Sequence, residues 1–276
     1  MLEPELVKTD QFRGISLDLG FGYVFGGQLV AQALAAAEQT VQVDQAAHSV
    51  HGHFLRPGNA CEPIIYQVDR IRDGKRFATR RVDATQDGRT IFTMTASFQS
   101  EETGFEHQSP KPRIPGPGGL LSQAEIAGQY KDSLPEAGLW HLSFERAIEI
   151  RPVDPVDIFH PQAKPALSRV WYRALDKLSE RPAVHRYLLA YISDMHMQSA
   201  AMQPHALTWN TSGLQTSSLD HAIWFHRPLR IDEWLLHVMD SPSASGARGL
   251  TRGQFFTQDG RLVASTMQEG LMRLRP

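Results

Sequence analysis

The chain matches itself at a nearly constant spacing, and this internal repeat limits the possible folds more than any other feature of the sequence. Residues 53–57 (His-Phe-Leu-Arg-Pro) resemble residues 224–228 (Trp-Phe-His-Arg-Pro) at an offset of 171. Farther along, Thr79-Arg80 and residues 85–89 match Thr251-Arg252 and residues 257–261 at an offset of 172. Two matches in the same order, with offsets that differ by one, predict a duplicated structural unit.

Both copies contain the same predicted elements. An apolar helix is expected at 29–37 in the first copy and at about 184–202 in the second. Both helices are apolar on most faces, so we expect each to be wrapped by a sheet. The predicted fold class is therefore α+β, with two tandem units that each wrap an antiparallel sheet around a central helix. An Asp-Gly turn in each copy predicts a β-hairpin, at 80–84 with 90–99 and at 252–256 with 262–267.

A segment rich in proline and glycine separates the two copies. Residues 108–119 hold four prolines and three glycines, a density that supports neither a helix nor a central strand. Beyond it, 120–135 is weakly helical and 146–160 returns to strand-like alternation. We therefore expect an N-terminal unit at 1–108, a linker with a short helix at 109–144, and a C-terminal unit at 145–276.

Composition and charge exclude several classes of protein. The 28 Lys+Arg and 30 Asp+Glu residues nearly balance, whereas nucleic-acid binding needs a basic excess on at least one face. Cys61 is the only cysteine, which excludes a disulfide framework and indicates a reducing compartment. The uncharged stretch 19–37 contains four glycines and two glutamines, which favours a loop and a buried helix over a membrane span. The first ten residues lack the apolar core of a secretory signal. We expect a cytoplasmic protein that binds no nucleic acid and inserts into no membrane.

The second predicted helix contains a carboxylate, Asp194, whose burial among apolar residues would cost free energy. Asp194 lies within the largely apolar run 186–197, where a buried carboxylate needs hydrogen bonds or a charged partner. Burial would also raise its pKa toward the range of a general base. On this basis Asp194 is either a candidate base or a residue that reaches solvent or fixes a strand by hydrogen bonds. In the first helix Gln28 follows the Gly26-Gly27 bend; it can orient a ligand or satisfy backbone groups, but it cannot accept a proton.

Other catalytic arrangements find little support in the sequence. His48, His51 and His53 fall in a predicted strand, where alternation would place His48 on the opposite face from the other two. With no HExxH motif and a single cysteine, this argues against a metal site. The sequence contains no GxSxG elbow for a serine nucleophile, and the glycine spacing at 20–26 does not fit a dinucleotide loop. We expect neither a metal nor another cofactor.

Taken together, the motifs resemble those of the TesB-type (type II) acyl-CoA thioesterases, a double-hotdog family. In the first half they are 25–28 (Phe-Gly-Gly-Gln), 48–58 (His-Ser-Val-His-Gly-His-Phe-Leu-Arg-Pro-Gly) and 80–82 (Arg-Arg-Val). In the second half they are Ser193-Asp194, 219–228 (Leu-Asp-His-Ala-Ile-Trp-Phe-His-Arg-Pro) and 264–270 (Ala-Ser-Thr-Met-Gln-Glu-Gly). The resemblance covers almost the whole chain outside the linker, and it implies two hotdog units in one chain.

The resemblance also implies which residues act. The family's site joins an Asp, a hydroxyl residue and a Gln of the second unit, which fall on Asp194, Ser218 and Gln268. The family commonly has Thr at the position of Ser218, and Ser217 or Thr216 would take its place if the register differs by one or two. The implied reaction is hydrolysis of fatty acyl-CoA to free fatty acid and coenzyme A, with a water that Asp194 deprotonates. Candidate substrate-binding residues are Gly27, Gln28, Tyr191 and Trp224, and ordinary core packing is the alternative for the aromatic ones.

Two other functions stay open on the same fold. An acyl-CoA-binding hotdog protein without turnover would not need Asp194 as a base. An enoyl-CoA hydratase-type hotdog enzyme needs an Asp and a His acting together, whereas Asp194 and His196 are two residues apart and would face apart on a helix. His48 is the alternative base, because it titrates near neutral pH. Hotdog sheets expose edges that usually pair with another unit, so we expect a homodimer or homotetramer.

Overall fold

The computed structural model describes residues 1–20, 22–130 and 147–275, which form two compact units. The first unit consists of Met1–His107, Arg181–Met195 and Leu219–His226. The second consists of the described residues of Gln108–Glu180, His196–Ser218 and Arg227–Pro276. Compared with the predicted division into 1–108 and 145–276, two segments of the second half therefore pack with the first unit, one as a helix and one as a strand.

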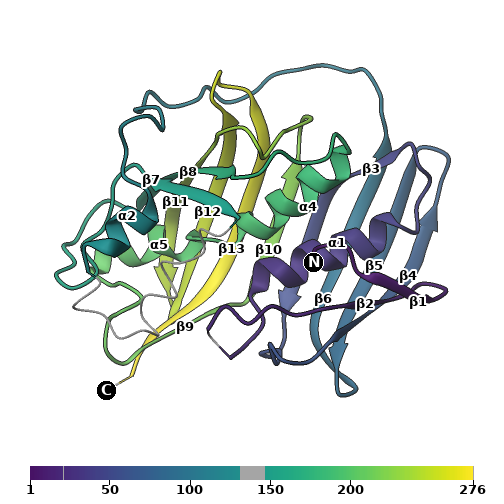
Figure 1. The fold of residues 1–276 in the computed structure, drawn as a ribbon, viewed down its shortest axis with the longest axis horizontal. Helices are drawn as coiled ribbons and strands as arrows, with labels where there is room; N and C mark the ends of the chain where they lie inside the picture. Colours follow the sequence, from purple (N-terminus) through teal and green to yellow (C-terminus); the bar gives the residue numbers. More distant parts are fainter. Residues whose placement is uncertain (21, 131–146, 276) are drawn as a thin grey trace. The chain divides into compact units, whose positions relative to one another are not determined.

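An antiparallel sheet and two helices make up the first unit. The strands are β1 (Glu5–Lys8), β2 (Gln11–Gly14), β3 (Gln45–Phe54), β4 (Ile64–Asp73), β5 (Phe77–Gln86), β6 (Arg89–Ser100) and β10 (Asp220–Phe225). They are hydrogen-bonded in the order β1-β2-β4-β5-β6-β3-β10, and these pairs are antiparallel. Helix α1 (Gly26–Glu38) lies against this sheet, and α4 (Pro182–Ser193) packs on α1 (Figure 1).

Helix α1 is the buried centre of the first unit. Its residues from Gly27 to Ala37 are all buried, which confirms the helix predicted at 29–37. Gln32, in the middle of the helix, donates from its amide to the carbonyl oxygens of Met1 (2.7 Å) and Ile15 (3.0 Å). A buried amide is tolerated there because its polar atoms are bonded. The helix is thereby tied to the N-terminal segment as well as to the sheet.

The turn between β5 and β6 has the backbone that its sequence predicts. Asp87 and Gly88 adopt φ angles of 47° and 71°, the left-handed pair that a two-residue hairpin turn requires and that Asp-Gly adopts at low cost. The predicted hairpin at 80–99 is therefore confirmed.

The second unit is also built on an antiparallel sheet. Its strands are β7 (Ile148–Pro152), β8 (Leu167–Ala174), β9 (Leu214–Ser218), β11 (Leu235–Ser245), β12 (Arg248–Thr257) and β13 (Leu262–Leu274). The order is β13-β12-β11-β8-β7, with β9 paired to β13 on its other side. The pairing of β12 with β13 confirms the second predicted hairpin.

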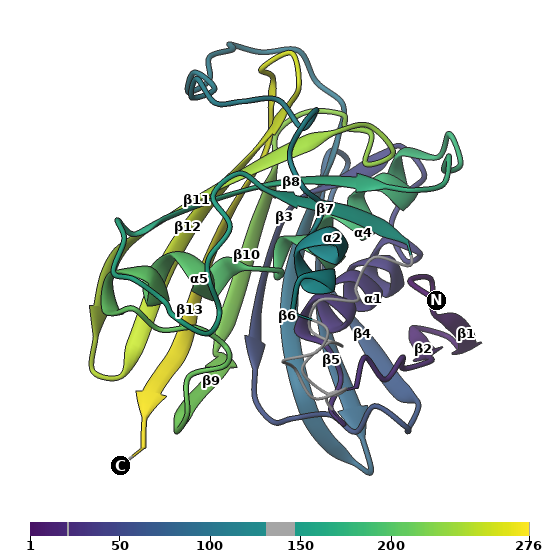
Figure 2. The same ribbon diagram turned by 60° about the vertical axis from the view of Figure 1, so that its left-hand side comes forward.

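Short helices complete the second unit. They are α2 (Gln123–Gly128), α5 (Met197–Met202) and the 3₁₀ turn η2 (Gln203–His205). Helix α5 packs against β11 and β12 (Figure 2). Of the helix predicted at 120–135, α2 is the part within the described residues, and 131–135 lies outside them. Residues 108–119 contain no helix or strand, as their proline and glycine content predicts.

The helix predicted at 184–202 is two helices, so the prediction of one continuous helix was wrong. Helix α4 ends at Ser193, with Asp194 as its C-cap, and α5 begins at Met197. His196 between them has a φ of 60°, a left-handed conformation that no helix can contain. Because the apolar pattern continues through the break, the sequence pattern gives no indication that the helix is interrupted.

The structure also corrects one alignment of the internal repeat. By sequence, Arg80 matches Arg252, but Arg80 is fully buried whereas Arg252 lies on the surface. The structural equivalent of Arg252 is Arg81, because each forms an ion pair with an aspartate of the neighbouring strand, Asp240 and Asp69 respectively. The offset is thus 171 before the hairpin turn. It becomes 172 after the turn, because Ala84 pairs with Phe92 in the first unit, whereas its equivalent Phe255 pairs with Ala264 in the second.

Candidate active site

Asp194 ends helix α4 and lies against the start of helix α1. It is 9% exposed, and a Cβ atom placed on Gly26 would lie only 2.6 Å from its Oδ2. The C-terminus of its own helix disfavours a carboxylate, whereas the N-terminus of a neighbouring helix favours one. Helix α1 begins with an apolar cap, Phe25, and has no acidic residue in its first turn. The Asp194 carboxylate therefore supplies negative charge where α1 has none of its own.

Gly27 and Tyr191 form the adjoining contact between the two helices. A Cβ atom on Gly27 would lie 2.1 Å from the carbonyl oxygen of Tyr191, and the Tyr191 ring meets Phe25 edge-on at 5.1 Å. Burial, and to a smaller extent the charge of Asp194, raise the pKa of Tyr191, so its phenol stays protonated at neutral pH. Two of the candidate substrate-binding residues, Gly27 and Tyr191, thus lie beside Asp194.

Gln28 points to a different part of the first unit. Its amide donates to the carbonyl oxygen of Ile15 (3.2 Å) and accepts from the backbone N–H of Leu17 (3.3 Å). These bonds hold the segment before the helix, and they match the alternative interpretation that Gln28 satisfies backbone groups. Its predicted role in substrate binding stays a prediction.

Ser218 and Gln268 meet in the second unit. Gln268, on β13, is 2% exposed and donates from Nε2 to the Oγ of Ser218 at 2.9 Å. Ser218 is the last residue of β9, where it pairs with Gly270 of β13. Ser217, the neighbour considered as a substitute, is exposed and hydrogen-bonds to the backbone carbonyl of Ser218 (3.3 Å). Of the hydroxyl residues considered, Ser218 is thus the one that bonds to Gln268.

Trp224 and the histidines of β3 lie on the other face of the first unit's sheet. Trp224 pairs with Ser49, and its ring meets His51 edge-on at 5.1 Å. Its neighbours His221 and Ile223 alternate to the face that carries the helices. Trp224 is therefore not brought to Asp194 within this unit.

The expectation that His48 lies opposite His51 and His53 was wrong. The pairing of β3 with β6 shifts by one residue between Ala47 and Ser49, and such a bulge moves His48 onto the same face as the other two. His48 bonds to the Ser97 hydroxyl at 2.8 Å, and burial lowers its pKa. Even so, the residues that the structure describes hold no group of three His, Cys, Asp or Glu arranged for a metal ion.

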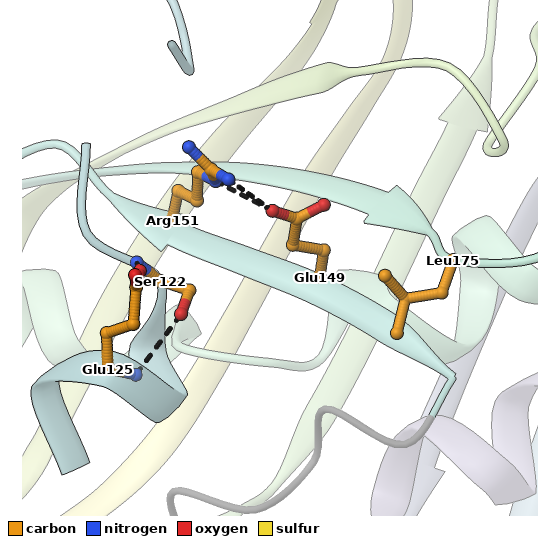
Figure 3. Close-up of a pocket in the computed structure, with 5 residues that line it drawn as sticks. All are labelled: Ser122, Glu125, Glu149, Arg151 and Leu175. Carbon is orange, nitrogen blue, oxygen red and sulfur yellow. Dashed lines mark hydrogen bonds and ion pairs between the residues drawn. The ribbon is translucent and has the colours of Figure 1, made fainter. Parts of the chain in front are cut away.

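A cavity of about 280 Å³ in the second unit is lined by five residues, drawn in Figure 3. These residues are Ser122, Glu125, Glu149, Arg151 and Leu175. Its polar groups bond to one another: Ser122 and Glu125 form a capping box, and Arg151 donates to Glu149 at 2.8 Å. The cavity contains none of the predicted site residues. In the part of the chain that the structure describes, no helix is long and apolar enough to cross a bilayer.

Known proteins are similar to this one over nearly the whole chain. A family model described as "Acyl-CoA thioesterase N-terminal domain" matches residues 17–99, and one described as "Acyl-CoA thioesterase" matches residues 143–271. "Acyl-CoA thioesterase 2" of Haemophilus influenzae is 40% identical over 99% of this chain and 96% of its own length. Human "Acyl-coenzyme A thioesterase 8" is 37% identical over 100% of this chain and 88% of its own length.

Solved structures agree. The acyl-CoA thioesterase II TesB2 from Mycobacterium marinum superposes with a TM-score of 0.81 at 40% identity, covering 99% of this chain and 97% of that chain. A hot dog fold protein from Alicyclobacillus acidocaldarius has a TM-score of 0.78 over 100% of this chain and 97% of that chain at 18% identity, which supports the fold alone. With relatives of 40% identity along nearly its full length, the chain belongs to the TesB-type acyl-CoA thioesterase family and has the α+β double-hotdog fold.

Proposed function

We propose that this protein hydrolyses fatty acyl-CoA to free fatty acid and coenzyme A, with Asp194 as general base. Ser218 and Gln268 are assigned to hold the attacking water. The hydrogen bond from Gln268 Nε2 to Ser218 Oγ carries this assignment, because it joins two polar side chains that lie fifty residues apart in the sequence. A hydroxyl and a primary amide can each donate and accept hydrogen bonds, which is the chemistry needed to hold a water.

The chemistry follows from these groups. Asp194 accepts a proton from the water as the oxygen attacks the thioester carbonyl carbon. The oxyanion that develops needs hydrogen-bond donors, for which the Gln268 amide and backbone N–H groups are suited. Collapse of the tetrahedral intermediate breaks the C–S bond and releases coenzyme A as a thiolate, which takes up the proton held by Asp194 and so restores the base. One water is consumed, and no covalent acyl-enzyme forms.

The base assignment is tested with Asp194→Asn. We expect hydrolysis of palmitoyl-CoA, followed by reaction of the released thiol with a chromogenic disulfide, to fall at least about 10³-fold, because the amide cannot accept the proton. Circular dichroism and the unfolding midpoint should stay close to those of the wild type. Full activity of Asp194→Asn would remove Asp194 from the mechanism, and loss of activity in His48→Ala instead would make His48 the base.

The same assay separates the alternative functions. An acyl-CoA-binding protein would release no thiol, and an enoyl-CoA hydratase would change the absorbance of an enoyl-CoA without releasing thiol.

We also propose a cytoplasmic location and assembly into a homodimer or homotetramer. The exposed edge strand β1 supports assembly, since all four of its residues are exposed and free edges tend to be covered. Light scattering after size-exclusion chromatography measures the number of chains.

A further inference from the structure

A buried serine and histidine meet at the end of helix α4, next to Asp194. Ser193 is 0% exposed and His221 is 1% exposed. The Ser193 Oγ lies 2.8 Å from His221 Nε2 and 2.8 Å from the carbonyl oxygen of Ala190. Ser193 is the last residue of α4, and His221 belongs to β10 of the same unit. The contact therefore joins the end of the helix to the sheet.

The direction of the two hydrogen bonds follows from proton counting. A carbonyl oxygen can only accept, so the single hydroxyl proton of Ser193 goes to Ala190. The bond to His221 then requires Nε2–H as the donor and the serine oxygen as the acceptor. His221 is consequently protonated at Nε2. A serine nucleophile needs the opposite arrangement, with an unprotonated histidine nitrogen accepting its proton. This pair therefore does not act as a nucleophile and its base, although the distance between the hydroxyl oxygen and the histidine nitrogen would suit such a pair.

We propose that His221, acting through Ser193, is a positioning residue for Asp194, an inference that rests on the proposed function. The last carbonyl groups of a helix have no intrahelical donor, and helix ends fray when these groups are left without partners. Ser193 satisfies the Ala190 carbonyl, and His221 holds Ser193 against the sheet. Asp194 follows directly, with its carboxylate against Gly26. A base displaced by about 1 Å can lose roughly 10²-fold in rate.

The first unit contains a matched arrangement away from Asp194. At the end of α1, the Thr40 hydroxyl donates to the Ala37 carbonyl (2.7 Å) and accepts from the buried Arg80 Nε (2.8 Å). Here too a hydroxyl at a helix end donates three residues back and accepts from a strand side chain. Thr40→Ala is thus a control that removes the same kind of tether from the opposite end of the neighbouring helix.

The experiment compares Ser193→Ala, His221→Ala, His221→Gln and Thr40→Ala by kcat, KM and Tm, with palmitoyl-CoA at a temperature well below every Tm. We expect kcat to fall about 10–100-fold in the first two variants, with KM within about threefold. His221→Gln keeps an N–H donor and should retain most of kcat. Thr40→Ala should lower Tm but leave kcat unchanged. The double variant Ser193→Ala/His221→Ala should lose no more than the more impaired single variant, because the two residues act as one tether.

Several outcomes would overturn the proposal. Unchanged kcat in Ser193→Ala at a lowered Tm would reduce the pair to a structural role, as would an equal loss of kcat in Thr40→Ala. Additive losses in the double variant would show that His221 acts independently of Ser193. Asp194→Asn, measured alongside, tests the proposed function separately. If it is inactive while Ser193→Ala and His221→Ala are normal, only the positioning role fails; if it is active, the assignment of the base fails.

Discussion

The proposed role of Ser218 depends on its hydroxyl group, which alanine lacks and threonine retains. Ser218→Ala removes the group that Gln268 contacts at 2.9 Å, and the loss of one hydrogen bond to the attacking water should lower kcat about 10–100-fold. Ser218→Thr keeps the hydroxyl and restricts its rotamer, so kcat should equal or exceed that of the wild type. Steady-state kinetics with palmitoyl-CoA measure both. Equal activity of the alanine and threonine variants would exclude Ser218 from catalysis.

Protonation of His196, which lies between α4 and α5, should make the unfolding free energy of the protein depend on pH. The Tyr172 hydroxyl lies 2.7 Å from His196 Nδ1, and burial lowers the pKa of His196 to about 4 from 6.5. The unfolded chain takes up a proton near pH 6.5 and the folded chain only near pH 4. The contribution of His196 to stability is therefore complete above pH 6.5 and is lost as the pH falls toward 4.

The variant His196→Asn isolates this effect, because asparagine tolerates the φ of 60° at this position and does not titrate. Between pH 7 and pH 4.5 the unfolding free energy of the wild type should fall by about 2–3 kcal/mol more than that of the variant. Urea unfolding at the two pH values measures the difference. Parallel losses in both proteins would mean that His196 is protonated equally in the folded and unfolded states.

At the scale of elements, close approach of α1 and α4 depends on Gly27. A methyl group there would meet the Tyr191 carbonyl at 2.1 Å, so Gly27→Ala should cost roughly 1–3 kcal/mol of unfolding free energy. Gly104→Ala is the control, since an added Cβ has nothing within 4 Å and surface changes stay within about 0.5 kcal/mol. Urea unfolding compares the two. A neutral Gly27→Ala would show that the helices can separate without loss.

The sequence predicts the elements better than their interruptions. Asp-Gly located both hairpins, and the run of alanines located α1, because these local signals act through backbone and burial alone. The break at His196 and the bulge after Ala47 leave no such signal, since tertiary contacts select them. The polar contact between Ser218 and Gln268 depends on the pairing of β9 with β13, so only the family resemblance could suggest it. Ser193 and His221 belong to the motifs that resemble the family, but only the structure shows that the two side chains are hydrogen-bonded.

At the scale of the whole molecule, the two units differ where the proposed chemistry occurs. On the strands that correspond by register, Ser218 pairs with Gly270 in the second unit, and Ala47 pairs with Phe98 in the first at offsets of 171 and 172. By the same register, Ala96 stands in the first unit where Gln268 stands in the second. Alanine offers no hydroxyl or amide to hold a water. Both units therefore have the same fold, but only the second has the polar groups of Ser218 and Gln268.

This asymmetry predicts the binding stoichiometry. A non-hydrolysable thioether analogue of palmitoyl-CoA should bind one molecule per chain in isothermal titration calorimetry, because Ser218 and Gln268 have no polar counterparts in the first unit. Ser218→Ala/Gln268→Ala should weaken that binding by about tenfold or more, at roughly 1.4 kcal/mol per factor of ten, whereas Ala96→Ser should leave it unchanged. Two equivalent molecules per chain would show that the first unit binds acyl-CoA without these groups. In that case recognition would be shared by both units, and Ser218 and Gln268 would serve turnover alone.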